Sequence, residues 1–503
     1  MFSYIQYIVA YPYSKAMNLK KPINQLIEEH QTETKTGLRR SLGPVNLITL
    51  GIGAIVGAGI FSLTGIVASE NAGPAVILSF VLAAVACGFC ALSYAEFASM
   101  IPVAGSAYTY TYATLGEFMA WIIGWDLVLE YALASATVAV SWSSYAVKFL
   151  AQFGADLPPE LITSPFDPVQ LSDGTVFTSG IINLPAVVIV SLLSLFLVKG
   201  TKESASLNNF LVILKVCVII LFIALGWSFI NRDNYTPFIP ENTGEFGHFG
   251  WSGIVRGAAV VFFGFIGFDA VSTTAQEAKN PQKDMPIGII GCLLVATILY
   301  VSFSYVMTGL VPYTEFLGDA SPAATAFAVT GYHFLNSALV IAILAGYTSV
   351  ILVMLMGQSR VFYSMSKDGL LPAFFSDVHP RYKTPWKSNL FFLVFVSALA
   401  GFVPISDLGH MVSIGTLFAF SLVSLGVIIL RYKQPEIHRS FKVPGVPFVP
   451  IIGIGICVFL MAGLPLESWE RLFVWMGIGI AFYFLYGKKH SKLGQQNSNN
   501  QPK

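Results

Sequence analysis

Twelve runs of mainly apolar residues limit the folds open to this 503-residue chain more than any other feature. A helix needs about 20 apolar residues to cross the roughly 30 Å of hydrocarbon in a bilayer. The chain is 55% hydrophobic and only 11% charged, so it is more apolar than ordinary soluble domains. The runs predict an all-α membrane protein with 12 transmembrane helices, near 45–69, 75–100, 115–149, 181–199, 206–230, 251–276, 287–311, 334–364, 388–404, 410–431, 447–465 and 470–487.

Basic residues gather in one set of loops, and they predict how the chain is oriented. Lysine and arginine are enriched in the cytoplasmic loops of membrane proteins. Lys35, Arg39 and Arg40 precede the first run, and Lys488 and Lys489 follow the last one. The opposite loops hold few basic residues and many acidic ones. We therefore expect a multi-pass protein of the cell (inner) membrane with cytoplasmic N- and C-termini, which agrees with an even number of spans.

Two of the runs are interrupted by glycines near their middle. The first reads GIGAIVGAGIF over 51–61, and the second reads FFGFIGFDAVST over 262–273. A helix inside a bilayer can lose backbone hydrogen bonds only where protein or a water-filled cavity satisfies the freed groups. Glycine is also common in membrane helices, where it lets neighbours pack closely, so either break alone is weak evidence. Together, the two breaks predict a binding site.

Five predicted crossings separate the two breaks, so the interrupted helices should run in opposite directions. Such an arrangement is typical of an inverted repeat that brings both breaks to the middle of the membrane. The predicted organisation is a cytoplasmic segment at 1–44, a first repeat of helices one to five at 45–231, a second, inverted repeat of helices six to ten at 251–431, two extra helices at 447–487 and a cytoplasmic tail at 488–503. The alternative is twelve unrelated helices with incidental glycines.

The backbone of the breaks suits the head group of an amino acid. Unwinding at Gly57, Ala58 and Gly59 exposes N–H groups at the positive end of a half-helix, where a carboxylate can bind. Carbonyls that end the opposing half-helices, such as those of Ile55 and Gly264, can accept hydrogen bonds from an ammonium group. An α-amino acid carries both groups on one carbon, so the pair of breaks predicts an amino acid site.

Five motifs occur together along the chain. They are GIGAIVGAGIF, PVAGSAYTY after the second run, WDLVLEY in the third, FFGFIGFDAVSTTAQEAKNPQKDMP around the sixth and GQSRVFYSMSKDGLLP after the eighth. With these motifs the chain resembles a bacterial member of the cationic amino acid transporter family, in the amino acid-polyamine-organocation (APC) superfamily. The similarity extends from about Leu38 to the last run. It implies the five-plus-five inverted-repeat fold of a bacterial leucine transporter (LeuT), and a secondary active transporter that works as a monomer, with or without a small accessory membrane subunit.

The resemblance also implies roles for individual residues. Ala58 and Gly59 would hold the substrate carboxylate. The substrate ammonium would donate hydrogen bonds to four backbone carbonyls, those of Ile55, Phe263, Gly264 and Ile266. Met354 falls where relatives place a residue that bounds the substrate side chain, and its bulk favours small neutral L-amino acids such as alanine over arginine or lysine. A plain packing role for Met354 is an equal alternative, and transport or exchange of cationic amino acids without proton coupling is the alternative function.

Lys215 is predicted to lie in the middle of the fifth span. It is about 20 Å along the helix from Lys202, at 1.5 Å per residue. Burial favours the neutral form of a lysine, so a proton could come on and off. Sodium-coupled relatives bind a cation in equivalent space, and we expect the Lys215 ammonium to contact carbonyls near Val56 and Gly57. We therefore predict proton-coupled symport, with H⁺ as the coupling ion and no cofactor. The alternative is that Lys215 stays permanently charged and only holds helices together, in which case the protein works by uniport or exchange.

Three carboxyl groups are also predicted at membrane depth, where charged groups are costly and so are functional candidates. Asp126 and Glu130 are four residues apart on one helical face. Glu130 could relay protons or contact the substrate, and a structural hydrogen bond to a neighbouring helix is an equal alternative. Asp269 follows the second break, where a structural role is favoured over contact with the substrate.

Other functional classes find little support in the sequence. The histidines are scattered and predict neither a metal site nor a nucleophile with its base, so we expect no enzyme. The five cysteines lie in apolar runs and are predicted to be buried free thiols. A channel would not place a lysine at mid-membrane. Charges are few and lie between the runs, so the expected partners are an amino acid and the lipid bilayer, not nucleic acid. A transporter-like amino acid sensor is the alternative of a different class.

Overall fold

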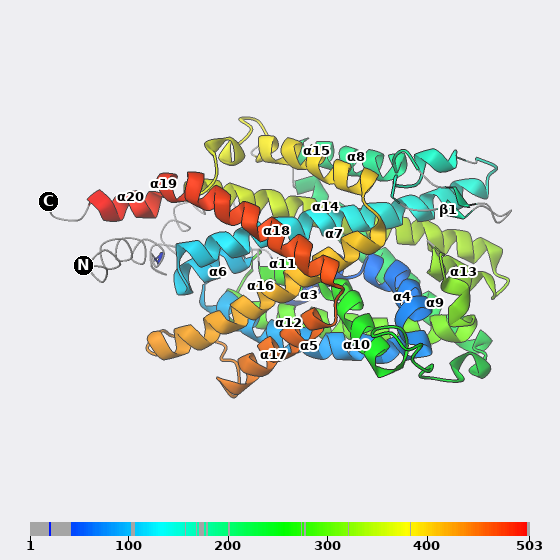
Figure 1. Cartoon of the computed structure of the whole chain (residues 1–503). Helices are drawn as coiled ribbons and strands as arrows, with labels where there is room; N and C mark the ends of the chain where they lie inside the picture. The colour runs from blue at the N-terminus through cyan, green and yellow to red at the C-terminus, as the bar shows by residue number, and fades with distance from the viewer. Residues whose placement is uncertain are drawn as a thin grey trace.

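Helices make up nearly all of the structure, as predicted (Figure 1). This computed structural model describes residues 20–21, 42–101, 106–155, 157–166, 169–170, 176–177, 180–199, 202–272, 274–275, 278–319, 321–382 and 384–499. Most of the predicted cytoplasmic segment at 1–44, the first residues of the PVAGSAYTY motif and the end of the tail lie outside these residues. The described part also contains a two-stranded antiparallel ribbon, which pairs β1 (Val169–Gln170) with β2 (Val176–Phe177) in a loop.

The α-helices follow the predicted apolar runs in order. Their bounds are α3 (Pro44–Ile55), α4 (Thr64–Val67), α5 (Val76–Met100), α6 (Ser106–Thr114), α7 (Glu117–Ala151), α8 (Leu184–Lys199), α9 (Lys202–Gly226), α10 (Gly250–Val261), α11 (Phe268–Ser272), α12 (Pro281–Leu310), α13 (Pro322–Ala328), α14 (His333–Lys367), α15 (Trp386–Phe402), α16 (Ile405–Lys433), α17 (Phe448–Ala462), α18 (Leu466–Phe482), α19 (Lys488–His490) and α20 (Lys492–Asn499). Each of the predicted runs overlaps at least one of these helices, whereas α6, α13, α19 and α20 lie outside the runs.

Several of these helical stretches are long and apolar enough to cross a membrane. Within the described residues there are seven, Gly59–Met100, Glu117–Ala151, Asn209–Phe229, Gly250–Ser272, Pro281–Leu310, Ser337–Lys367 and Asp407–Lys433. An eighth is added if Phe448–Ala462 and Leu466–His490, bent by 113°, form one span. Shorter apolar helices occur at Pro44–Ile55, Leu184–Lys199 and Trp386–Phe402. A multi-pass membrane protein built almost wholly of helices is therefore confirmed, whereas the count of 12 spans stays a prediction.

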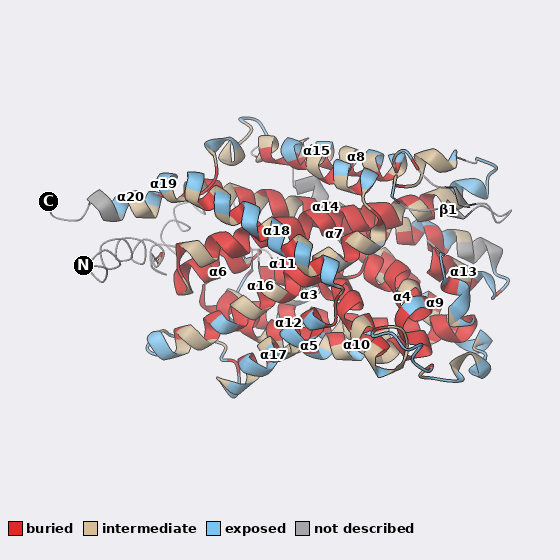
Figure 2. Ribbon diagram, in the orientation of Figure 1, coloured by how far each residue is buried: buried red, intermediate tan, exposed pale blue. Residues whose placement is uncertain are grey.

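The two longest helices, α7 and α14, form the centre of the bundle. Each has 35 residues, and they pack along one another. Of the most apolar stretch of α7, 94% is buried, compared with 39% for the span at Asn209–Phe229. Figure 2 shows the same contrast between a buried interior and outer helices with exposed faces. The most apolar stretch of α7 is therefore almost wholly enclosed by protein, an environment in which an interrupted helix can satisfy its backbone.

Polar contacts tie distant parts of the chain together at the end of the bundle where α14 ends. Asp368, just after α14, accepts hydrogen bonds from Lys21 Nζ at 2.8 Å and from the Tyr108 hydroxyl at 2.7 Å. Glu117, at the start of α7, accepts from the Tyr112 hydroxyl at 2.8 Å and from Ser491 of the C-terminal segment. The segment that follows α18 is thus fastened to the centre of the bundle.

The cysteines only partly follow the prediction. Cys87, Cys90, Cys292 and Cys457 are buried free thiols, and the sulfurs of Cys90 and Cys457 are 3.4 Å apart. Cys217 is exposed, so the prediction that it is buried is wrong. It lies on the outward face of α9, the span with the smallest buried share. An apolar neighbourhood in sequence does not distinguish the inner face of such a helix from its outer face.

Candidate functional site

The first glycine-rich run breaks its helix at Val56. α3 ends at Ile55, and Val56 is extended, with φ −75° and ψ 104°. The chain becomes helical again in a π-helical turn at Gly59–Leu63. Such a break leaves C=O groups at the end of one helix and N–H groups at the start of the next without their usual partners.

The second run breaks in a similar way. α10 ends at Val261 and continues as a 3₁₀ turn at Phe262–Phe265, after which Ile266 is extended, with ψ 135°. Gly267 has φ +117°, a conformation that favours glycine. A Cβ at this position would also come 2.8 Å from the Cβ of Ala54. Glycine is therefore required here by both its backbone and its neighbour.

The two interrupted segments lie antiparallel along their length. The amide of Lys279 donates to the Leu42 carbonyl at 2.8 Å at one end. At the other end, the amide of Phe249 donates to the Asn71 carbonyl at 2.7 Å. The order of the contacts is thus reversed between the segments, as expected for helices that run in opposite directions.

The two breaks touch each other through glycine backbone. A Cβ added to Gly59 would come 2.2 Å from the Cα of Gly264. One added to Gly264 would come 3.3 Å from the Cα of Gly59 and 3.2 Å from the Tyr300 ring. Gly57 faces α14 instead, where an added Cβ would come 3.1 Å from Val350. The glycines at 59 and 264 therefore permit an approach that any larger residue would prevent.

A small apolar cavity lies beside the breaks. Its lining consists of Ala54, Ile55, Gly57, Ala58, Ala134, Val138, Phe263, Ile266, Val350 and Met354. Its volume of about 10 Å³ has room for roughly one water molecule, so side chains must move before an amino acid fits. Every lining residue is apolar. The arrangement can therefore enclose an aliphatic side chain next to exposed backbone groups.

Six of the eight residues predicted to bind the substrate line this cavity, namely Ile55, Gly57, Ala58, Phe263, Ile266 and Met354. Gly59 and Gly264 lie in the contact between the breaks instead. Sequence reasoning missed the other four lining residues, which are Ala54 of α3, Ala134 and Val138 of α7 and Val350 of α14. They stand in long apolar runs with no signal that separates them from ordinary packing residues.

Sequence reasoning also missed Tyr300 of α12, which bridges the two breaks. Its hydroxyl lies 2.9 Å from the Ile55 carbonyl oxygen and 2.6 Å from that of Gly264. A hydroxyl has one hydrogen, so it donates to one of these carbonyls at a time. Both carbonyls are among those predicted to receive the substrate ammonium. The Tyr300 hydroxyl therefore stands where an ammonium group would donate.

Replacing Tyr300 with phenylalanine is expected to lower the free energy of unfolding by about 1–3 kcal/mol, because buried carbonyls lose a donor. Thermal unfolding of the purified protein should show a larger stabilisation by added amino acid than in wild type, since the ammonium no longer displaces a hydroxyl. Tyr94→Phe is the control, because the buried Tyr94 hydroxyl has no hydrogen-bond partner among the described residues. Equal losses of stability in the two variants would contradict the bridge.

Lys215 of α9 lies against the first break and is fully buried. Its Nζ donates to the carbonyls of Gly53 at 2.5 Å and Val56 at 2.9 Å, and to Ser349 Oγ of α14 at 3.2 Å. The expected neighbourhood included Val56 and Gly57, and the contacts are with Val56 and Gly53. The lysine thus connects α9, the end of α3 and α14. Its part in proton coupling stays a prediction.

The three predicted carboxyl groups are all buried, but their surroundings differ. Asp269 accepts hydrogen bonds from the Tyr131 hydroxyl at 2.6 Å and the Gly267 amide at 3.2 Å, so it braces the second break against α7. The oxygens of Asp126 and Glu130 have no hydrogen-bond partner among the described residues. Neither residue lines the cavity, and a relay role for Glu130 stays a prediction. The described part of the chain contains no group of three or more metal-binding side chains.

Comparisons with known proteins bear on the family of the chain. Residues 42–483 match the amino acid permease family. The chain is 48% identical to the branched-chain amino acid permease BcaP of Bacillus subtilis, over 95% of this chain and 98% of that protein. It is 43% identical to the methylthioribose transporter of the same species, over 95% and 99%. It is 39% identical to the vacuolar cationic amino acid transporter 4 of Arabidopsis thaliana, over 79% and 64%.

Proposed function

Because this chain belongs to the amino acid permease family of the APC superfamily, we propose that it carries neutral aliphatic L-amino acids by proton-coupled symport. Its relatives are permeases and transporters, so it is a membrane transporter and not an enzyme. The proposed cycle is alternating access, in which the site between the breaks opens to one side of the membrane at a time. Alanine is the smallest substrate in the proposed class.

The apolar cavity lining is the observation that carries the substrate class. Met354 is 2% exposed and lines the cavity together with Val138 and Val350. A guanidinium or ammonium group placed there would lose its water without gaining a partner, which is costly. The name of the Bacillus subtilis relative, a branched-chain amino acid permease, agrees with an aliphatic side chain. Other relatives are named as cationic amino acid transporters, so arginine and lysine are the alternative substrates.

The head group is proposed to bind between the two breaks. N–H groups around Ala58 and Gly59 would donate hydrogen bonds to the carboxylate. The ammonium would donate to the carbonyls of Ile55, Phe263, Gly264 and Ile266. The close approach of Gly59 and Gly264 supports this proposal, because it brings the backbones of the two breaks into contact. The antiparallel course of the interrupted helices supports the proposed five-plus-five inverted repeat with 12 spans. Cytoplasmic termini, and function as a monomer, are part of the same proposal.

Uptake into proteoliposomes tests the proposal. Labelled alanine and leucine should accumulate in wild-type vesicles under an inward proton gradient and less without it. Excess unlabelled alanine should compete, and arginine should compete only at much higher concentrations. Failure of every amino acid to accumulate or compete would overturn the substrate class. Uptake that ignores the gradient would overturn proton coupling and leave the substrate class intact.

Met354→Ser is expected to admit cationic amino acids, because a shorter polar residue removes the bulk at the end of the cavity. We expect arginine to compete with labelled alanine about 10-fold better than in wild type. A difference of one or two methylene groups in a pocket changes the discrimination between substrates by about this factor. Met356→Ser is the control, since Met356 lies on the same helix and does not line the cavity. Unchanged competition by arginine would show that Met354 is only a packing residue.

A further inference from the structure

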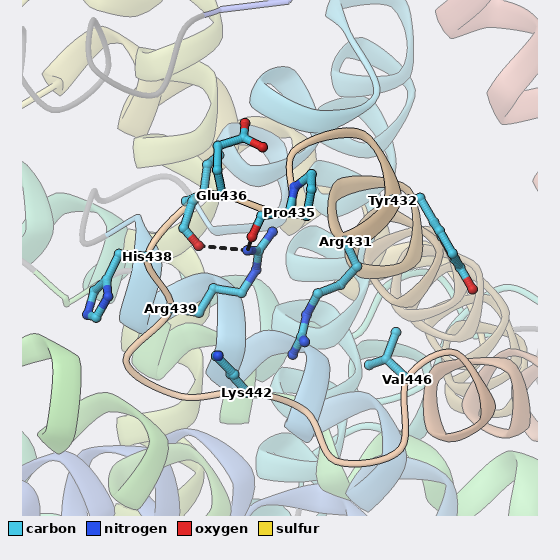
Figure 3. Close-up of a pocket in the computed structure, with 9 residues that line it drawn as sticks. Arg431, Tyr432, Pro435, Glu436, His438, Arg439, Lys442 and Val446 are labelled. Carbon is cyan, nitrogen blue, oxygen red and sulfur yellow. Dashed lines mark hydrogen bonds between the residues drawn. The ribbon is translucent and has the colours of Figure 1, made fainter.

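A second, larger cavity lies at the end of α16 and in the loop to α17. Its volume is about 480 Å³, and its lining is Arg431, Tyr432, Pro435, Glu436, Ile437, His438, Arg439, Lys442 and Val446 (Figure 3). None of these residues lines the cavity between the helix breaks. The proposed transport cycle therefore assigns no role to this cavity, although it is rich in basic side chains.

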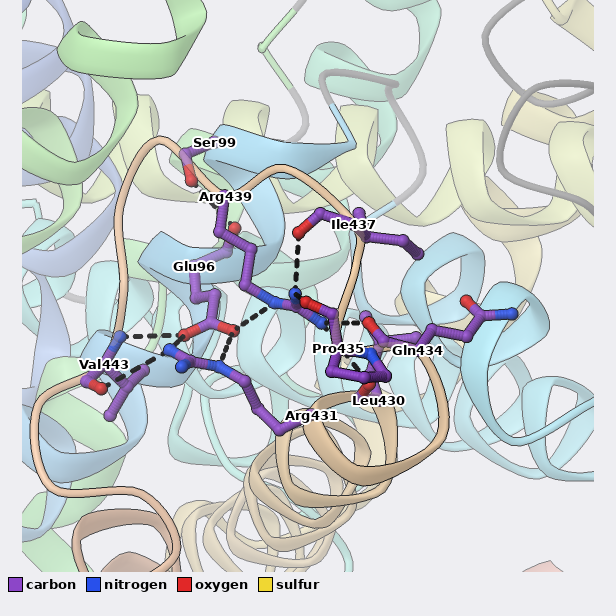
Figure 4. Close-up of polar contacts among 9 residues, drawn as sticks. All are labelled: Glu96, Ser99, Leu430, Arg431, Gln434, Pro435, Ile437, Arg439 and Val443. Carbon is purple, nitrogen blue, oxygen red and sulfur yellow. Dashed lines mark hydrogen bonds and ion pairs between the residues drawn. The ribbon is translucent and has the colours of Figure 1, made fainter.

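Glu96 of α5 holds two of the arginines in place (Figure 4). Arg431 donates to the Glu96 carboxylate from Nε at 2.8 Å and from Nη2 at 2.7 Å. Arg439 Nε lies 3.3 Å from the same carboxylate, and the Val443 amide donates to it at 2.8 Å. The Nη atoms of Arg439 donate to the carbonyls of Leu430, Gln434, Pro435 and Ile437. These contacts order the Arg431 and Arg439 side chains before any ligand arrives.

The cavity keeps an excess of positive charge after these contacts. Arg431, Arg439 and Lys442 are cationic, whereas Glu96 and Glu436 supply two carboxylates, so one positive charge is left over. Lys442 Nζ has no hydrogen bond or ion pair with any described residue, and Arg431 Nη1 has none either. Figure 3 shows the Lys442, Arg431 and Arg439 side chains around the same cavity. Two free donors at an ordered basic surface favour an anion with several oxygens, such as a phosphate group.

The surroundings indicate where such a phosphate comes from. The cavity lies at the ends of apolar helices, where lipid headgroups meet a membrane protein. Large side chains beside it are exposed, with Tyr432 at 70%, Phe448 at 72% and Ile451 at 52%. A soluble phosphate would not use this apolar surface, whereas acyl chains would cover it. We propose that the cavity binds the phosphate headgroup of an anionic phospholipid, with its acyl chains against α17.

Thermal unfolding of the full-length protein, in detergent with added lipid, tests this site. Phosphatidylglycerol should raise the midpoint of wild type by several degrees more than phosphatidylcholine does. Lys442→Glu should lose most of this difference, because the change reverses the charge at a free donor. Lys433→Glu is the matched control, since Lys433 is exposed on the same segment and does not line the cavity. Native mass spectrometry should show phosphatidylglycerol bound to wild type and to the control, and at least several-fold less bound to Lys442→Glu.

Three outcomes would overturn the proposal. Equal stabilisation by phosphatidylglycerol and phosphatidylcholine would remove the need for an anionic group. An equal loss in Lys442→Glu and Lys433→Glu would reduce the effect to general attraction of basic loops to acidic lipid. Stabilisation by inorganic phosphate alone, at the full size seen with phosphatidylglycerol, would show that the cavity takes a soluble phosphate instead of a lipid.

Discussion

Gly59→Ala is expected to reduce amino acid uptake to background. The added Cβ would come 2.2 Å from the Cα and 3.0 Å from the amide nitrogen of Gly264. Both atoms belong to backbone, which cannot turn aside as the end of a flexible side chain can. The two breaks would be forced apart, and backbone groups proposed to hold the carboxylate and the ammonium would lose their relative positions. Uptake of labelled alanine into proteoliposomes, at equal amounts of inserted protein, measures this effect.

Gly88→Ala is the matched control for Gly59→Ala. Gly88 lies inside the membrane helix α5, and a Cβ there would meet nothing within 4 Å. We expect this variant to transport like wild type and to be as stable or slightly more stable, since alanine is the better helix former. Wild-type uptake by Gly59→Ala would contradict the proposed contact between the breaks. Losses of the same size in both variants would show that the effect is a general one of glycine replacement.

Lys215→Ala is expected to abolish accumulation driven by a proton gradient. The ammonium of Lys215 donates to the carbonyls of Gly53 and Val56, so its protonation state bears directly on the first break. Without it, no buried basic group at this position can gain and lose a proton during the cycle. We expect uptake under an inward proton gradient to fall at least 10-fold, while counterflow exchange between equal concentrations of labelled and unlabelled alanine persists.

Counterflow separates coupling from a structural role for Lys215. Removing the lysine leaves two buried carbonyls without their donor, at a cost of about 1–3 kcal/mol in stability. If exchange is lost together with accumulation, the lysine is mainly a tie between α9, α3 and α14. Full accumulation by Lys215→Ala would overturn proton coupling through this residue. Lys433→Ala is the control, because Lys433 is an exposed lysine at the end of α16.

Much of the site was predictable because it depends on backbone. Glycine clusters inside apolar runs predict where a membrane helix breaks. The second helix breaks at Ile266 and Gly267, within its predicted cluster, whereas the first is extended at Val56, one residue before the predicted unwinding at Gly57, Ala58 and Gly59. The direction of the two segments followed from counting the runs between them. Lys215 was predicted at membrane depth from its distance along one helix, and it is fully buried. These inferences require only spacing within a single segment or the number of segments.

Other parts of the site were not predictable because they depend on helix packing. Tyr300 bridges carbonyls of Ile55 and Gly264, which belong to two different segments. Nothing in the run around Tyr300 distinguishes it from other buried tyrosines, such as Tyr347. The rotation of each helix about its axis decides which residues face the cavity. Sequence periodicity hardly reports that rotation when a helix is apolar on every side.

The sequence by itself determined that this chain is a helical, multi-pass membrane protein with two interrupted helices and a lysine inside an apolar helix. Hydrophobicity and glycine act locally, so these features can be identified along the chain. Only the tertiary structure decided that the breaks touch through Gly59 and Gly264, that an apolar cavity lies beside them, and that Glu96 orders Arg431 and Arg439 more than 330 residues away. Such contacts depend on how whole helices pack, and no local pattern specifies that.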